Sequence, residues 1–352
     1  MLGCRNRWHR RCTSTPTVGR ALAIAVCALV LLCAPAAADP RPQFDNFCTP
    51  AIPGLEELSG MAAIGDKYYA LGDSGTDDKL AVLDGNCGLV RWLNVPVDPY
   101  DTEDVAAFEG QLWLSDTGDN LRRRDTVSLT SMSPDDGSGE LHRLTYPDGK
   151  HDAEALLIEP AGRPLIVTKE FSGPAGIYVP TGDTRITDLP SPGPAPLQRV
   201  GQVDLRKPTA TGQTGPSPLV TGGAVSADGT VIALRTYSDV FLFAVPGGDF
   251  VKALTTGTPV VVTPRPQPQG ESVTFTPAGD LLVGSETGGD GKPFPPLQIL
   301  RGATALVAPV AAPHEREIDT GPHTWIWVAG VGSAVVIGGV VGAFALRRRR
   351  KL

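Results

Sequence analysis

Short apolar runs separated by turn residues recur along the middle of the chain in one fixed order. Each recurrence consists of an acidic or small residue, a short apolar strand, a turn, a second strand and a polar residue. The five recurrences begin at Ser59, Glu103, Glu154, Gly223 and Glu271. Two more strand-like runs often follow, as at residues 79–83 and 89–94. Four short strands every ~40–50 residues are typical of propeller blades, so the pattern predicts an all-β fold of the β-propeller type.

The spacing of the recurrences favours five blades, with six as the alternative. The interval between Glu154 and Gly223 is longer than the others and contains a proline-rich stretch at residues 190–218, which suits either a surface loop or unrecognised strands. A β-sandwich is the other all-β fold considered, but it gives no reason for this period. The fifth recurrence is short, so we expect residues 43–48 to supply the strand that closes the ring.

The two ends of the chain predict export and a membrane tether. Residues 1–38 have the basic, apolar and small-residue order of a secretory signal peptide. Residues 325–346 are apolar, carry no charge and are long enough for one C-terminal transmembrane α-helix. The basic tail at residues 347–352 stays in the cytoplasm. The sequence therefore predicts a single-pass cell-membrane protein in which residues 39–306 form an extracytoplasmic propeller above an Ala/Pro-rich stalk at residues 307–324.

The predicted membrane helix also contains a small-residue motif. Gly338 and Gly342 form a G-x-x-x-G pattern, a spacing that lets two helices approach closely. It predicts a weak homo-oligomer through these glycines, with a simple glycine-rich membrane helix as the alternative.

Charge and cysteine usage agree with export. All 38 acidic residues lie outside the two terminal basic segments, which hold 10 of the 31 lysines and arginines, so the remainder has a net charge of 21 minus 38, or −17. A domain this acidic repels nucleic acid, which we exclude as a partner. The mature chain keeps only Cys48 and Cys87. Two cysteines in an oxidising compartment are expected to pair, so we predict a Cys48–Cys87 disulfide.

Carboxylates at equivalent points of the recurrences are the first candidate site. Glu103, Glu154 and Glu271 begin three of the predicted inner strands, which line the central channel of a propeller. Such a ring of charges is costly unless a cation compensates it. Lys169 and Arg235, which end second strands, are candidates for that role. The alternative is a bound Ca²⁺, because this ion takes carboxylate and carbonyl oxygens.

A second acidic cluster adds further candidates. Asp116, Asp119 and Asn120 offer oxygen ligands in one tight turn, and the alternative is a solvated turn with an Asx cap. Asp116 and His151 are candidate catalytic bases for a metal-activated water. His151 lies beside acidic residues, although a lone histidine of this kind is more often a surface or hydrogen-bonded residue.

Five segments in order resemble a group of bacterial exported, membrane-anchored β-propeller proteins that is distantly similar to the TolB-like and phytase-like propellers. The segments, which span much of residues 59–300, are Glu103-Asp104-Val105-Ala106, Asp116-Thr117-Gly118-Asp119-Asn120, Asp152-Ala153-Glu154-Ala155-Leu156, Ala233-Leu234-Arg235-Thr236-Tyr237 and Gly270-Glu271-Ser272-Val273. The resemblance implies a propeller fold and metal ions on the channel face. Its phytase-like side implies phosphate-ester hydrolysis.

The sequence is consistent with two classes of function. The first is a membrane-anchored module that binds an envelope protein or a small-molecule ligand. The second is a Ca²⁺-dependent hydrolase, such as a phosphoesterase or a lactonase, that acts at the central channel. Because no recognisable nucleophile is present, the sequence slightly favours binding, although a metal-activated water needs no nucleophilic side chain.

Overall fold

The computed structural model of the chain describes residues 42–206 and 218–307. The predicted signal peptide, membrane helix and basic tail, and the stalk after Val307, lie outside the described residues. Within the described ranges, no helix is long and apolar enough to cross a membrane. These ranges cover most of the predicted propeller.

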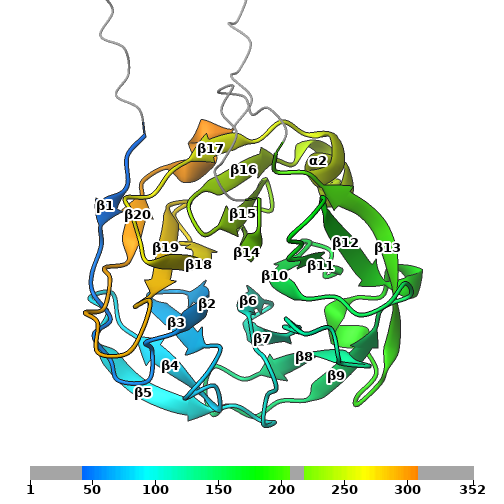
Figure 1. Cartoon of the computed structure of the whole chain (residues 1–352), viewed down its shortest axis with the longest axis horizontal. Helices are drawn as coiled ribbons and strands as arrows, with labels where there is room; N and C mark the ends of the chain where they lie inside the picture. Colours follow the sequence, from blue (N-terminus) through cyan, green and yellow to red (C-terminus); the bar gives the residue numbers. More distant parts are fainter. Residues whose placement is uncertain (1–41, 207–217, 308–352) are drawn as a thin grey trace, which may run out of the picture.

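The described strands form five antiparallel four-stranded groups (Figure 1). The first group is β2 (Leu58–Ile64), β3 (Lys67–Gly72), β4 (Lys79–Leu83) and β5 (Leu89–Asn94). The second is β6 (Asp104–Phe108), β7 (Gln111–Asp116), β8 (Val127–Met132) and β9 (Leu141–Thr145). The third is β10 (Ala153–Ile158), β11 (Pro164–Thr168), β12 (Ala175–Pro180) and β13 (Ala195–Val203).

The last two groups complete the ring. The fourth is β14 (Val220–Val225), β15 (Val231–Thr236), β16 (Val240–Ala244) and β17 (Val260–Val262). The fifth is β18 (Gln269–Phe275), β19 (Leu281–Glu286), β20 (Gln298–Leu300) and β1 (Asp45–Asn46). The short helix α2 (Phe250–Thr256) lies between β16 and β17, and the 3₁₀ turns are η2 (Thr181–Asp183), η3 (Ile186–Asp188), η4 (Pro246–Gly248) and η5 (Ala303–Leu306).

The groups stand around a common centre, with β2, β6, β10, β14 and β18 innermost (Figure 1). This architecture confirms the predicted all-β, propeller-like fold. The described part of the long interval after Glu154 contains β12 and β13, so β13 runs inside the proline-rich stretch. The start of β13 pairs in parallel with β9, Ala195 opposite Leu144, and joins the second and third groups into one eight-stranded sheet.

Apolar side chains fill the space between neighbouring groups rather than one central core. One cluster, for example, packs Leu71 and Leu80 of the first group against Leu112 and Leu114 of the second. Equivalent clusters lie at the other four junctions between the described groups. Each strand is thus covered on both faces, which explains the continuous apolar runs in the sequence.

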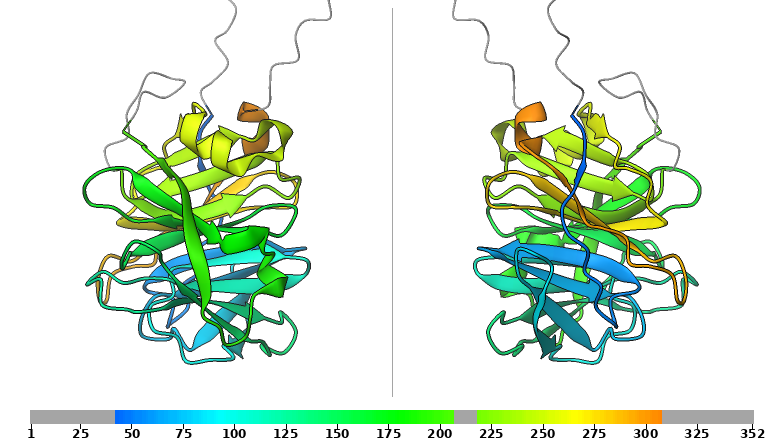
Figure 2. Two further views of the ribbon diagram at one scale, coloured as in Figure 1. Left: turned by 90° about the vertical axis from the view of Figure 1, so that its right-hand side faces the viewer. Right: turned by 90° about the vertical axis from the view of Figure 1, so that its left-hand side faces the viewer.

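The N-terminal segment closes the ring, as predicted. Asp45 and Asn46 of β1 pair with Ile299 and Gln298 of β20, so the first strand completes the last group. Figure 2 shows β1 alongside the C-terminal segment. Closure removes the unpaired edge that an open group would expose.

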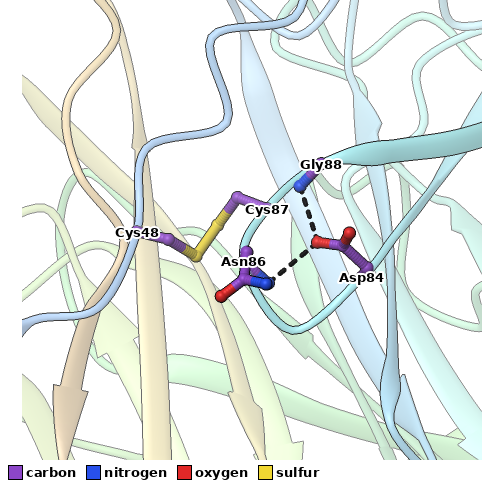
Figure 3. Close-up of a disulfide and its surroundings, with 5 residues drawn as sticks. All are labelled: Cys48, Asp84, Asn86, Cys87 and Gly88. Atoms are coloured by element: carbon purple, nitrogen blue, oxygen red, sulfur yellow. Dashed lines mark hydrogen bonds between the residues drawn. A yellow bond between two sulfur atoms is a disulfide. The ribbon is translucent and has the colours of Figure 1, made fainter.

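The predicted Cys48–Cys87 disulfide is present (Figure 3). Cys48 follows β1, and Cys87 lies in the turn between β4 and β5, with the two Cα atoms 5.8 Å apart. In that turn, one Asp84 carboxylate oxygen accepts hydrogen bonds from the backbone N–H groups of Asn86 and Gly88. The disulfide therefore fastens the closing strand to the first group.

Replacing both cysteines tests this fastening. The double substitution Cys48→Ala, Cys87→Ala should lower the free energy of unfolding by about 3 kcal/mol, because the unfolded chain regains the freedom that the cross-link removes. Urea unfolding of the oxidised wild type and the variant measures the loss. Wild type treated with a reductant should match the variant, and an unchanged midpoint would show that closure does not depend on the disulfide.

Candidate functional site

Irregular pairing in the innermost strands positions the side chains at the end of the channel where these strands begin. The register between first and second strands shifts at Ser59 in β2, at Glu154 in β10 and at Thr221 in β14. In β18 the shift covers Glu271. A β-bulge at each position redirects the extra side chain. The register also corrects the sequence alignment of the fourth recurrence, where Thr221 rather than Gly223 is equivalent to Glu154.

Glu103, Asp152 and Glu154, here called the first acidic group, lie at the start of β6 and β10. One carboxylate oxygen from each lies within 4.8 Å of the others, and all three side chains are buried. Lys169, at the end of β11, forms an ion pair with Glu154. Asp152 Oδ2 and Glu154 Oε2 have no hydrogen-bond partner among the described residues. The structure thus brings together two of the three predicted glutamates and adds Asp152.

Asp73, Glu271 and Glu286, here called the second acidic group, come from the ends of β3 and β19 and from β18. Their nearest oxygens also lie within 4.8 Å of one another. Gln269 Nε2 donates hydrogen bonds to both glutamates. Asp73 Oδ1 and Glu271 Oε2 have no partner in the part of the chain that the structure describes. Glu271 therefore belongs to a different group from Glu103 and Glu154.

Both acidic groups lie at one end of the channel, because first strands start and second strands end on the same side of an antiparallel sheet. We call this end the channel mouth. Burial raises the pKa of Glu154 to about 8, that of Glu271 to about 9 and that of Asp73 to about 7, and neighbouring carboxylates add to each shift. Burial also raises the pKa of Asp101, beside the first group, to about 6. These carboxyl groups therefore bind protons more tightly than free carboxyl groups do, and at Glu154 the Lys169 ammonium opposes the rise in pKa.

The two predicted channel cations differ in their surroundings. The Lys169 ammonium pairs with Glu154 and lies 5.3 Å from the centre of the Tyr237 ring. The Arg235 side chain is 1% exposed, and its Nη2 donates to Gln267 Oε1 at 2.5 Å. Within the described ranges Arg235 forms no ion pair, and burial lowers its pKa to about 9. Lys169 therefore neutralises one carboxylate directly, whereas Arg235 acts only through its nearby charge.

The turn at residues 116–120 supports the mouth instead of joining either acidic group. Asp116 accepts from the backbone N–H of Asp101 at 3.0 Å and forms an ion pair with Arg124 at 2.8 Å. Asp119 accepts from two backbone N–H groups and donates its own N–H to Asp152 at 2.8 Å. Asn120 is exposed. In this arrangement protein donors occupy the two carboxylates, and both side chains are buried rather than solvated.

His151 also lies outside both acidic groups. Its Nε2 is 3.1 Å from Asp148 Oδ1 and 3.0 Å from the Tyr178 hydroxyl, and its Nδ1 is 3.4 Å from Glu170 Oε1. The imidazole is therefore held within a polar and aromatic cluster of the third group.

Asp104, which follows Glu103 in the sequence, is a central residue of the channel. Its fully buried carboxylate accepts backbone N–H bonds from Val105 at 2.8 Å, Leu156 at 2.9 Å and Gly223 at 3.2 Å. These donors come from three innermost strands, β6, β10 and β14. Burial raises the pKa of Asp104, and the three N–H bonds oppose that shift. The carboxylate thus ties three groups together across the channel.

Beyond Asp104 the channel continues as a small cavity of about 180 Å³ that is lined mostly by residues with apolar side chains. All five innermost strands line it, with residues such as Met61, Ala106, Ile158, Val225 and Phe275. Asp104 precedes these wall positions along β6 and follows Glu103, so it separates the acidic mouth from the apolar end.

Comparison with known proteins adds little to this picture. No protein-family model matches the chain, and no curated protein matches it. A solved gluconolactonase from Xanthomonas campestris is similar over 69% of this chain and 71% of its own, with 14% identity and a TM-score of 0.41. A chain of a nidogen/laminin complex is similar over 65% and 72%, with 10% identity and a TM-score of 0.38. The propeller-like fold is assigned from the sheet topology.

The Lys169–Glu154 pair can be tested by a double-mutant cycle. Lys169→Met should lower the free energy of unfolding by about 3–5 kcal/mol, because it leaves Glu154 buried without its cation. Adding Glu154→Gln should recover part of that loss. Urea unfolding of the four proteins gives the coupling energy, and strictly additive losses would show that the two side chains do not interact.

The raised carboxyl pKa values predict a pH dependence of stability. Each of these groups binds its proton more tightly in the folded chain than in the unfolded chain, where its pKa is about 4. Their contribution is therefore complete at low pH and is lost as the pH rises through about 7 for Asp73, 8 for Glu154 and 9 for Glu271.

The melting temperature in EDTA should accordingly fall between about pH 5 and about pH 9. Glu271→Gln should show a smaller fall, because the amide stays neutral throughout. A melting temperature that is constant or rises over this interval would contradict the prediction.

Proposed function

We propose that the chain is a membrane-tethered, extracytoplasmic five-bladed β-propeller that acts as a binding module, and that its channel mouth binds a cationic group. The five four-stranded groups are the proposed blades. The tether and the exported location rest on the sequence of residues 1–38 and 325–352. The resemblance to exported bacterial propellers agrees with this placement.

One observation carries the proposal: buried carboxylate oxygens without partners converge at the mouth. They include Glu154 Oε2, Asp152 Oδ2 and Glu271 Oε2, each on a side chain that is at most 3% exposed. A buried acceptor without a donor costs about 1–3 kcal/mol, and more when it is charged. A cation that enters the mouth would satisfy these oxygens and offset that cost.

Exposed apolar side chains on the loops at the same end support a binding face. Tyr100 and Leu121 are 68% exposed and Phe171 is 71% exposed. They lie in the β5–β6, β7–β8 and β11–β12 loops, and an ion pair of Arg122 with Glu170 joins the last two loops. Aromatic and arginine side chains are enriched at protein interfaces. A ligand with a cationic group beside apolar surface would fit both features.

The geometry favours binding over the hydrolase alternative. The candidate bases Asp116 and His151 lie outside both acidic groups, and each is hydrogen-bonded to protein groups. A hydrolase that used a side-chain base would need that base beside the substrate. Neither of these two residues belongs to an acidic group of the mouth, which supports binding.

Thermal stability in the presence of small cations tests the proposal. Ca²⁺, Mg²⁺ and the organic amine cadaverine should each be tried with the full chain at low ionic strength. A cation that binds the mouth stabilises the fold by about 2.7 kcal/mol at a hundredfold excess over its Kd. The combined substitution Glu154→Gln, Glu271→Gln should remove the effect, whereas Glu140→Gln, at an exposed position between β8 and β9, should not. The proposal fails if no cation stabilises the wild type.

A further inference from the structure

We infer that the two acidic groups have different occupants: the second acidic group is a Ca²⁺ site, and the Lys169 ammonium fills the cation position of the first. The inference rests on the proposed function, because a mouth that binds no cation has no calcium site.

The first acidic group already has a cation of its own. The Lys169 ammonium contacts Glu154 and is held over the Tyr237 ring, and both members of the ion pair are buried. The remaining carboxylates are also partly served, since Asp152 accepts from the Asp119 N–H at 2.8 Å and the Ser59 hydroxyl lies 3.4 Å from Glu103 Oε2. A divalent ion entering this group would have to displace or repel the lysine.

The second acidic group has no such cation. Within residues 42–206 and 218–307, no lysine or arginine forms an ion pair with Asp73, Glu271 or Glu286. Gln269 supplies only a neutral amide to the two glutamates. Asp73 Oδ1 and Glu271 Oε2 remain unpartnered, and the Glu271 side chain is 3% exposed. Three carboxylates with two free buried oxygens therefore face one another without an ion-pair partner, and the buried Arg235 acts on Glu271 only from a distance.

The ligand set suits Ca²⁺ better than Mg²⁺. The three ligand oxygens lie within 4.8 Å of one another, which is compatible with Ca²⁺–oxygen bonds of about 2.3–2.6 Å. Mg²⁺ demands near-ideal octahedral geometry and usually keeps several waters, so three carboxylates from separate strand ends suit it less. Ca²⁺ also accepts irregular geometry and mixed ligands, so waters can complete its shell.

The position of Asp73 gives the ion a route from solvent. Asp73 follows β3 in the loop to β4 and is only partly buried, whereas all members of the first acidic group are buried. The second group is therefore the more accessible of the two as well as the less neutralised.

Calcium titration of the full chain tests the inference, with calorimetry for stoichiometry and Tb³⁺ luminescence as a second probe. The wild type should bind one Ca²⁺. Glu271→Gln and Asp73→Asn should each weaken binding at least tenfold, because each removes a ligand charge. Glu140→Gln, at an exposed position away from the mouth, is the matched control and should keep the wild-type affinity. Glu154→Gln probes the first acidic group and should weaken binding less than Glu271→Gln does. Circular dichroism establishes that each variant is folded.

Removing the lysine gives a converse test. Lys169→Met should leave the first acidic group without its cation and raise the stoichiometry from one Ca²⁺ to two, while one equivalent in a folded variant would overturn the role given to Lys169. Calcium binding that is lost in Glu154→Gln but kept in Glu271→Gln would reverse the assignment and leave the proposed function standing. Stabilisation of the wild type by cadaverine without calcium binding would also overturn the inference alone. If neither cation binds, the proposed function fails with it.

Discussion

The innermost strands approach one another so closely that some of their positions accept only glycine. A Cβ atom on Gly60 would lie 2.9 Å from the backbone of Asp104, and one on Gly222 would lie 2.5 Å from the Glu271 carbonyl oxygen. At these two positions there is no room for a side chain between the neighbouring strands. Backbone N–H groups that face the axis must still be satisfied, and the Asp104 carboxylate does this for three strands at once. One side chain therefore spans three groups where ordinary packing cannot.

The same convergence gathers negative charge at one end of the axis. The acidic residues lie at the ends of the strands that meet at the mouth. The convergence of these strands therefore brings Glu103 near Glu154, and Glu271 near Glu286. Water is largely excluded there, so each charge needs a proton, an internal cation or a bound ion. Raised pKa values favour a bound proton at several of these carboxyl groups, and the Lys169 ammonium serves as the internal cation. A bound ion is the remaining option for the unpartnered oxygens of Glu271 and Asp73.

Local sequence patterns were enough to predict the repeated unit, the closing strand and the disulfide. The runs that begin near Ser59, Glu103, Glu154 and Glu271 form the first strands, because apolar strands between turns are determined by local residue order. The pattern could not show which carboxylates meet. Glu271 is separated from Glu154 by the fourth group. Asp73 comes from the end of β3, and Asp152 comes from the loop that precedes β10. Thr221 was misaligned because a bulge is a feature of strand pairing, which one strand's sequence does not reveal.

The position of the disulfide has a consequence for how the chain assembles during synthesis. β1 emerges early, but its partner β20 is about the last strand to be made, since Asp45 pairs with Ile299. Cys48 and Cys87 are only 39 residues apart and become available together long before then. Once joined, they keep the first strand beside the first group while the other groups form. The cross-link thus keeps β1 in position until β20 forms and pairs with it. The ring can then close without a free N-terminal segment having to diffuse back to the last group.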